Sequence, residues 1–375
     1  MPEPIVVTLQ PLTPLWTGDA DQRGNRIRET GILGSLRWWY EALVRGLGLY
    51  ACDPSSGSCV YDERRKLVSI CRACQLFGCT GYSRRFRLAV AGGGSAGQLT
   101  EVRILKPGTS NHRGWRIPRN VCAPFTLALH PLRPDALDDF ERAAIRHTLH
   151  LIEQYGALGA KTSHGQGVVK ITGWGTLPAV METDAWIRAM KARPAKEDTN
   201  PQPAPDLSEF IGATITLDAA ATSSADWWKL IPLTGLGSFS LGSNPTWVPS
   251  GPAVRARLRG WLRNSANFQN FNGNLPNERH RLMGYVPQRG EKGDPKGSDI
   301  FVTHLYKADE RWSMRIFAFV PRGGNAVDHG VRQLLSDQKR LESEVAIGLG
   351  GLNVQAEPYP ATVRALLGVG SAISE

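Results

Sequence analysis

The chain has 375 residues, of which 41% are hydrophobic, and this composition excludes a disordered chain and leaves room for two domains. Its 44 Lys and Arg residues against 34 Asp and Glu residues give a formal net charge of +10, which favours nucleic acid over a membrane surface as the partner. There is no long apolar run, and the N-terminus lacks the basic-then-apolar order of a signal peptide. We therefore expect a cytoplasmic protein that does not span a membrane.

The first predicted elements are a strand, a polar loop and a helix. Residues 5–18 alternate apolar and polar side chains and are rich in β-branched residues, which indicates a strand that runs into a loop at 18–30. Residues 31–48 carry apolar side chains at helical spacing, and two glycines leave the first turn without bulk. Exposed backbone amides at such a helix start suit an anion. Arg37 lies about one turn further on and is a candidate RNA ligand; the alternative is an ordinary surface arginine.

An insertion at about 51–75 contains a cysteine pattern typical of a metal site. Cys52, Cys59, Cys71 and Cys74 have the spacing C-x6-C-x11-C-x2-C, and four thiolates satisfy the closed tetrahedral demand of a structural zinc. The insertion is poor in apolar residues and needs the metal to hold it together. Cys79 is a spare ligand. Cys122 reads as a buried strand cysteine.

Arginines follow the cysteines directly. Arg84 and Arg85 begin a strand-like alternation at 83–88, where they suit a phosphate backbone or guard a solvated strand edge. A basic loop at 106–120, a strand at 122–130 and a helix at 134–155 come next.

A glycine-rich loop at 156–167 precedes a closing strand at 168–171. It is either mobile or tightly turned, and it contains Lys161, Thr162 and His164. It has neither the Walker nor the dinucleotide-binding pattern, but its amides can contact phosphates.

The order strand, helix, strand, strand, helix, strand predicts an α+β chain that begins with a ferredoxin-like unit. We expect a first domain at 1–190, a proline-rich, extended and exposed linker at 191–210, and a second, degenerate copy at 211–375.

The elements of that second copy are expected in the same order as in the first. They are an opening strand at 229–241, a helix at 252–264 with Arg257, a basic glycine loop with Arg289 within 281–306, a strand at 312–323, a helix at 328–347 and a short glycine loop at 348–352.

Three blocks, GILGSLRWWYEAL, CRACQLFGCTGYSRRFRL and GALGAKTSHGQGVVKI, together resemble the RAMP superfamily of CRISPR proteins, and most of all the subunit 1 family of the type III-B Cmr effector complex. They lie within residues 28–171. The second half is similar only in the order of its elements and in RLMGYVPQRG.

The resemblance implies two tandem ferredoxin-like (RAMP/RRM-like) domains and a non-catalytic subunit for antiviral defence. Such a subunit holds crRNA and complementary target RNA near the crRNA 3′ end, beside the other Cmr subunits. Target cleavage is then the task of a repeated backbone subunit that uses an aspartate in the loop after its first strand. Asp19 and Asp21 occupy that loop here, and we interpret them as solvated loop acids.

The RNA contacts expected in this family are Arg37, Arg84, Arg85, Lys161 and His164 around one groove, with Thr162, Arg257 and Arg289 as further contacts. The contacts are expected to position the backbone without reading sequence. Two alternatives stay open. One is a metal-independent RAMP-type endoribonuclease with His164 or His112 as general base. The other is a zinc-stabilised scaffold that binds only protein.

Overall fold

The computed structural model describes residues 3–18, 24, 26–93, 102–105, 114–117, 121–175, 177, 181–198, 204–224, 226–232, 245–268, 271–285 and 296–368, with only the backbone at 102–105 and 114–117. Asp19, Asp21, His112 and Arg289 lie outside the described residues, so the roles expected of them stay predictions.

The first half of the chain forms an antiparallel sheet with the strand order β2-β5-β1-β6. Its strands are β1 (Ile5–Pro11), β2 (Phe86–Gly92), β5 (Phe125–Pro131) and β6 (Val169–Gly173). Every second residue of β1 and β5 is buried beneath the helices, as the period of two predicts.

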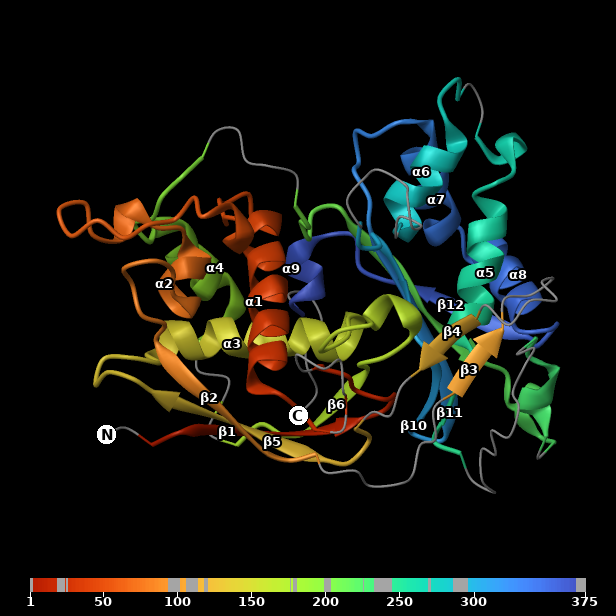
Figure 1. Ribbon diagram of the computed structural model, residues 1–375, viewed down its shortest axis with the longest axis horizontal. Coiled ribbons are helices and arrows are strands. Elements are labelled where there is room, and N and C mark those ends of the chain that lie inside the picture. The colour runs from red at the N-terminus through yellow and green to blue at the C-terminus, as the bar shows by residue number, and fades with distance from the viewer. Residues whose placement is uncertain are drawn as a thin grey trace.

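Helices cover one face of this first sheet (Figure 1). They are α1 (Glu29–Gly46), α3 (Asp139–Tyr155), the short α2 (Arg72–Phe77) and α4 (Thr183–Ala192). A separate hairpin pairs β3 (Val102–Leu105) with β4 (Gly114–Ile117), and β4 falls within the loop predicted at 106–120.

The second half repeats the arrangement with the strand order β12-β7-β11-β10-β8, and β9 also pairs with β11. Its strands are β7 (Phe210–Leu217), β8 (Trp247–Val248), β9 (Ile300–Val302), β10 (Leu305–Ala308), β11 (Arg311–Phe319) and β12 (Val354–Pro358). Its helices are α5 (Gly251–Trp261), α6 (Leu275–Met283), α7 (Ala326–Ser336), α8 (Gln338–Gly348) and α9 (Val363–Leu366). In both sheets the last strand of the unit lies beside the first, which is the ferredoxin-like order, so the predicted α+β class is confirmed.

Three predicted elements differ from the structure. The opening strand of the second half is β7, so placing that strand at 229–241 is wrong. Residues 227–230 form a 3-10 turn, and 233–241 lie outside the described residues. The helix predicted from 134 begins at Asp139, because Leu137 has φ = +60° and Asp138 caps the helix by accepting from the Glu141 amide. The helix predicted at 328–347 is broken at Asp337, whose side chain caps α8.

The core of the first half extends into the second half, which also has a core of its own. Trp39 of α1 packs against Phe210, Phe317 and Phe319 of the second sheet, with ring centroids about 6 Å apart. Helix α9 returns to the first half, where Leu366 is buried in that same cluster. In Figure 1 it lies beside α1. Among the described residues, no helix is long and apolar enough to cross a membrane.

Candidate functional site

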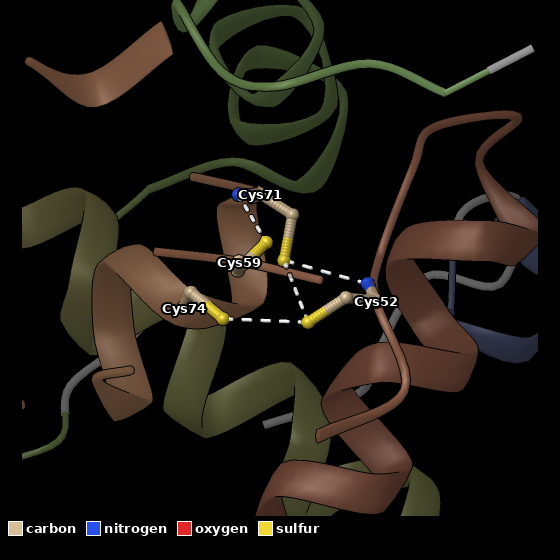
Figure 2. Close-up of side chains that lie close together, drawn as sticks. All are labelled: Cys52, Cys59, Cys71 and Cys74. Carbon is tan, nitrogen blue, oxygen red and sulfur yellow. Dashed lines mark hydrogen bonds between the residues drawn. The ribbon is translucent and has the colours of Figure 1, made fainter. Parts of the chain in front are cut away.

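Four cysteines converge beside α1 (Figure 2). Cys52 follows α1, Cys59 lies in the insertion, Cys71 caps α2 and Cys74 lies in its first turns. All four are buried free thiols, and their sulfur atoms lie within 4.8 Å of one another. The Cys52 sulfur is 3.4 Å from that of Cys74 and 3.6 Å from that of Cys71. Ligands of a tetrahedral zinc at about 2.3 Å would be roughly 3.8 Å apart, so this cluster could hold a metal ion.

The surroundings of the cluster suit thiolates. The Cys52 amide donates to the Cys71 sulfur and the Cys71 amide to the Cys59 sulfur, at 3.5 and 3.4 Å. Hydrogen bonds among the four thiols, that of Cys52 first, hold the pKa of Cys71 well below its usual range. The same network raises the pKa of Cys52, through Cys59 first, and that of Cys74, through Cys52 first. Four thiolates around a divalent ion leave two net negative charges. A cation nearby is therefore expected.

That cation is Arg37, which had been predicted to bind RNA. Its guanidinium donates to the Cys74 sulfur at 3.3 Å, to the Glu41 carboxylate at 2.7 Å and to the Gly78 carbonyl at 2.9 Å. Only 17% of the side chain is exposed. The structure thus uses this arginine at the cysteine cluster, and an RNA contact by Arg37 stays a prediction.

The two remaining cysteines lie outside the cluster. Cys79 is half-buried and its sulfur faces the Thr80 carbonyl. Cys122 is also half-buried, just before β5, and burial raises the pKa of its thiol to about 11.

The cysteine insertion also holds the segment predicted as a linker. Arg72 donates to the carbonyls of Met190 and Arg193, and the Ile70 carbonyl accepts from the Lys196 amide. On α1, Arg45 donates to the carbonyls of Cys52 and Pro205, at 3.0 and 2.9 Å. The described part of this segment is therefore fastened through its backbone to the residues around the candidate metal ligands.

A cavity of about 510 Å³ opens between the two halves. The start of α1 and the glycine loop line one side, with Trp38 and Trp39 next to Lys161 and Thr162. The segment 296–301 and Phe317 line the other side. The cavity therefore combines aromatic faces with hydroxyl groups, two lysines and the carboxylate of Asp299, which pairs with Lys296 at 3.0 Å.

The glycine loop is tightly turned. Lys161 adopts φ = +58° and begins a 3-10 turn, Thr162–His164, and its ammonium lies 4.1 Å from the Trp16 ring centroid. Gly165 has φ = +106°, and a Cβ there would lie 2.3 Å from Nδ1 of His304. Only glycine fits there.

His164 lies behind the cavity, not in it. Burial first, then the charges of Arg255 and Lys161, lowers the pKa of His164 to about 4. Its neighbour His304 is fully buried. The imidazole of His164 is therefore neutral at physiological pH.

The remaining predicted RNA contacts do not join the cavity. Arg85 is buried and pairs with Glu141 and Asp135 near the start of α3, whereas Ala157, in the cavity wall, follows the end of that helix. The length of α3 therefore places the ion pairs of Arg85 about 20 Å from the cavity wall at Ala157. Arg84 is half-buried, and Arg257 of α5 pairs with Glu344 of α8 at 2.6 Å.

Sequence reasoning missed two parts of the cavity. Trp38 is half-buried and lines the cavity beside the buried Trp39. The adjacent pair was a usable signal, because neighbouring residues on a helix point about 100° apart. The segment 296–298 had no comparable signal, since only the fold brings it to α1.

Comparison with known proteins first identifies a superfamily that part of the chain resembles. Residues 8–170 match the model of the RAMP superfamily, which confirms the resemblance over that part of the chain. No curated protein matches the sequence.

Among solved structures, the chain is similar to Cmr1 from Pyrococcus furiosus in its apo form, with 13% identity, a TM-score of 0.43, and coverage of 94% of this chain and 98% of that one. It is also similar to a chain of the type III-B Cmr-beta complex bound to cognate target RNA, with 11% identity, a TM-score of 0.45, and coverage of 93% and 100%. A further structure of that complex, with AMPPnP and single-stranded DNA present, gives 11% identity, a TM-score of 0.46, and coverage of 93% and 100%.

Proposed function

We propose that this chain is an RNA-binding RAMP subunit of a type III-B CRISPR effector complex, in which it holds crRNA and target RNA beside other Cmr subunits. The observation that carries the proposal is the RAMP match over residues 8–170, the region that contains the glycine loop and the start of α1. The net charge of +10 supports a polyanionic partner.

The cavity between the halves is the first RNA contact in this proposal. Aromatic faces such as that of Trp38 stack on unpaired bases, and Lys161 and Lys296 face the phosphates. None of these groups distinguishes one base from another by a paired donor and acceptor, so the binding is independent of sequence.

The ion in the cysteine cluster is zinc in this proposal. Four buried sulfur ligands at the spacing of a tetrahedron match a closed structural site with no open position for catalysis. Zinc would hold the insertion in place and would take no part in RNA chemistry.

The subunit is non-catalytic in this proposal. His164, the candidate general base within the described residues, is largely buried and faces two cations, with no acid among the charged groups that shift its pKa. The alternative, a RAMP-type endoribonuclease, predicts shortened products when the purified chain is incubated with labelled repeat and target RNA. Intact RNA is the result expected here.

The RNA-binding proposal is tested by fluorescence anisotropy with several unrelated single-stranded RNAs at increasing salt. Replacing Lys161→Gln and Lys296→Gln should weaken binding of all sequences alike and flatten the slope of log affinity against log salt by about 1.4, because each lost phosphate contact contributes about 0.7 for a single strand.

The control is the pair Arg64→Gln and Arg188→Gln, which removes the same charge from exposed positions in other elements. Equal losses in both pairs would leave net charge as the only cause. No binding by the unaltered chain would refute the proposed function itself.

A further inference from the structure

Helix α5 carries a row of arginines. Arg255 and Arg259 are four residues apart on one helix face, and Arg263 follows in the turn that closes the helix, where its amide donates to the Gly260 carbonyl. Helices α5 and α6 meet where Arg255 donates to the Met283 carbonyl, and Arg279 of α6 stands four residues before Met283, as Arg259 stands four residues after Arg255. The charge of Arg279 accordingly acts on Arg259. In Figure 1 both helices lie on the side of the second sheet away from α1.

The first member of the row is structural. Arg255 is buried and donates to the Ser298 hydroxyl and to the carbonyls of Ile300 and Met283, so its donors are used within the fold. The other three differ: Arg263 is exposed, and Arg259 and Arg279 are half-buried. We call Arg259, Arg263 and Arg279 the arginine cluster.

The arginine cluster has no acidic partner within the described part of the chain. The nearby acids are engaged by other cations, Glu278 by Arg281 at 2.6 Å and Glu344 by Arg257 at 2.6 Å. Nε of Arg279 is buried and without a hydrogen-bond partner, and one of its terminal nitrogens lies 3.5 Å from Nε2 of His280.

The three guanidiniums repel one another. Burial first, then the charges of Arg279 and Arg263, lowers the pKa of Arg259, and burial first, then Arg263, lowers the pKa of Arg279. Like charges held together lower the stability of the fold, and a bound anion would relieve that cost.

We propose that Arg259, Arg263 and Arg279 bind consecutive phosphates of an RNA backbone, at a surface in the second half that is separate from the cavity between the halves. The planar fork of each guanidinium matches two phosphate oxygens. None of the three lines the cavity. The inference rests on the proposed RNA-binding function and assigns the second half a contact of its own.

The test compares the full-length chain with Arg259→Gln/Arg263→Gln/Arg279→Gln, using labelled single-stranded RNAs from 0.1 to 0.4 M salt. Three lost phosphate contacts should flatten the log–log salt slope by about 2 and weaken binding on the order of 100-fold at 0.1 M salt. Arg259→Lys/Arg263→Lys/Arg279→Lys keeps the charges and should retain most of the slope.

The charge-matched control is Arg64→Gln/Arg87→Gln/Arg188→Gln, three exposed arginines on separate elements of the first half. It should stay close to the unaltered chain, because charges beyond a Debye length of about 10 Å at 0.1 M salt are screened. Equal effects of the two triple arginine-to-glutamine variants would overturn the inference and leave the proposed function standing. Failure of the unaltered chain to bind RNA would refute the proposed function as well.

The melting temperature separates binding from a structural role. Removing mutual repulsion should leave the melting temperature of the glutamine triple equal to, or above, that of the unaltered chain. A marked fall would make the three arginines structural and overturn the inference.

Discussion

The same residue type has several uses in this chain. Arg37 lies against the cysteine sulfurs, Arg85 is buried between two carboxylates, and Arg259 has no acidic partner among the described residues. In the sequence all three stand beside glycines or aromatic residues and suit an anion equally well. The difference lies in what the fold brings to each one: Arg37 meets the cysteine sulfurs and Glu41 one turn along α1, and Arg85 meets two carboxylates that are remote in sequence.

Two histidines face each other where the glycine loop meets the second sheet. His304 is fully buried, and its Nδ1 accepts from the Gly251 amide at 3.2 Å. Burial first, then the charge of His164, lowers the pKa of His304 to about 3, and that of His164 is lowered to about 4. Both are therefore neutral in the folded chain near pH 7.

We predict that the free energy of unfolding falls as the pH drops below about 6.5. There the unfolded chain takes up protons, since its histidines keep a pKa of about 6.5, while the folded chain does not. Each of these histidines should contribute a loss of about 2 kcal/mol between pH 6.5 and pH 5. Urea unfolding at several pH values measures this loss.

The control is His304→Asn, in which the amide oxygen can replace the Nδ1 acceptor but does not titrate. Its stability should depend on pH less steeply than that of the unaltered chain, although His147, with a pKa lowered to about 4 by burial, keeps its share in both. Identical pH dependence in the two proteins would contradict the assignment.

At the scale of elements, the cysteine insertion and the segment 191–207 act as one structure. Gln75 of α2 donates to the Pro194 carbonyl at 2.8 Å, and the Ala42 carbonyl of α1 accepts from the Leu207 amide at 3.0 Å. The path of this segment toward the second sheet thus depends on α2, whose first turns carry two of the candidate metal ligands.

We predict that removing the metal exposes this segment to trypsin. Elemental analysis should detect zinc in the unaltered chain and none after chelation or in Cys74→Ser. Either change should raise cleavage after Lys191 and Lys196 at least about tenfold, the effect of losing about 1.4 kcal/mol of local stability. Cys122→Ser, outside the cluster, should keep both the metal and the resistance to trypsin. Unchanged cleavage of the metal-free chain would show that the fastening does not depend on the metal.

Most elements of the first half were predictable, because each has its own period and its own end signals. Strand β7 was missed although FIGATITL alternates, since the glycine-rich 229–241 segment imitates the composition of the opening strand and loop. The four metal candidates followed from spacing alone. The cavity could not be predicted, because its walls come from segments more than 100 residues apart that only the packing of the two sheets brings together.

At the scale of the molecule, the halves are joined by more than the shared aromatic cluster. Arg315 of β11 donates to the carbonyls of Ile152, Glu153 and Gly156 at the end of α3. The Ile152 carbonyl also accepts from the Gly156 amide, and Arg315 adds further donors at this helix end, where the last carbonyls run out of helical amides. The second half thus caps a helix of the first.

We predict that Leu366→Ala lowers the free energy of unfolding by about 2–4 kcal/mol, the usual effect of removing a buried leucine side chain. Both halves should unfold in a single transition, followed by tryptophan fluorescence and by circular dichroism. Leu230→Ala, at an exposed position, should change stability by less than about 0.5 kcal/mol. Two separate transitions would show that the shared core does not couple the halves.

The return of α9 to the first half has a consequence for biosynthesis. Strand β6 closes the first sheet, but the side chains of Val363 and Leu366 that complete its core are made last. At roughly 5–20 residues per second, the ribosome needs about 10–40 s to pass from the end of β6 to the end of α9. During that time the nascent first half keeps an apolar surface open to solvent, so we expect chaperones to bind it before α9 is made.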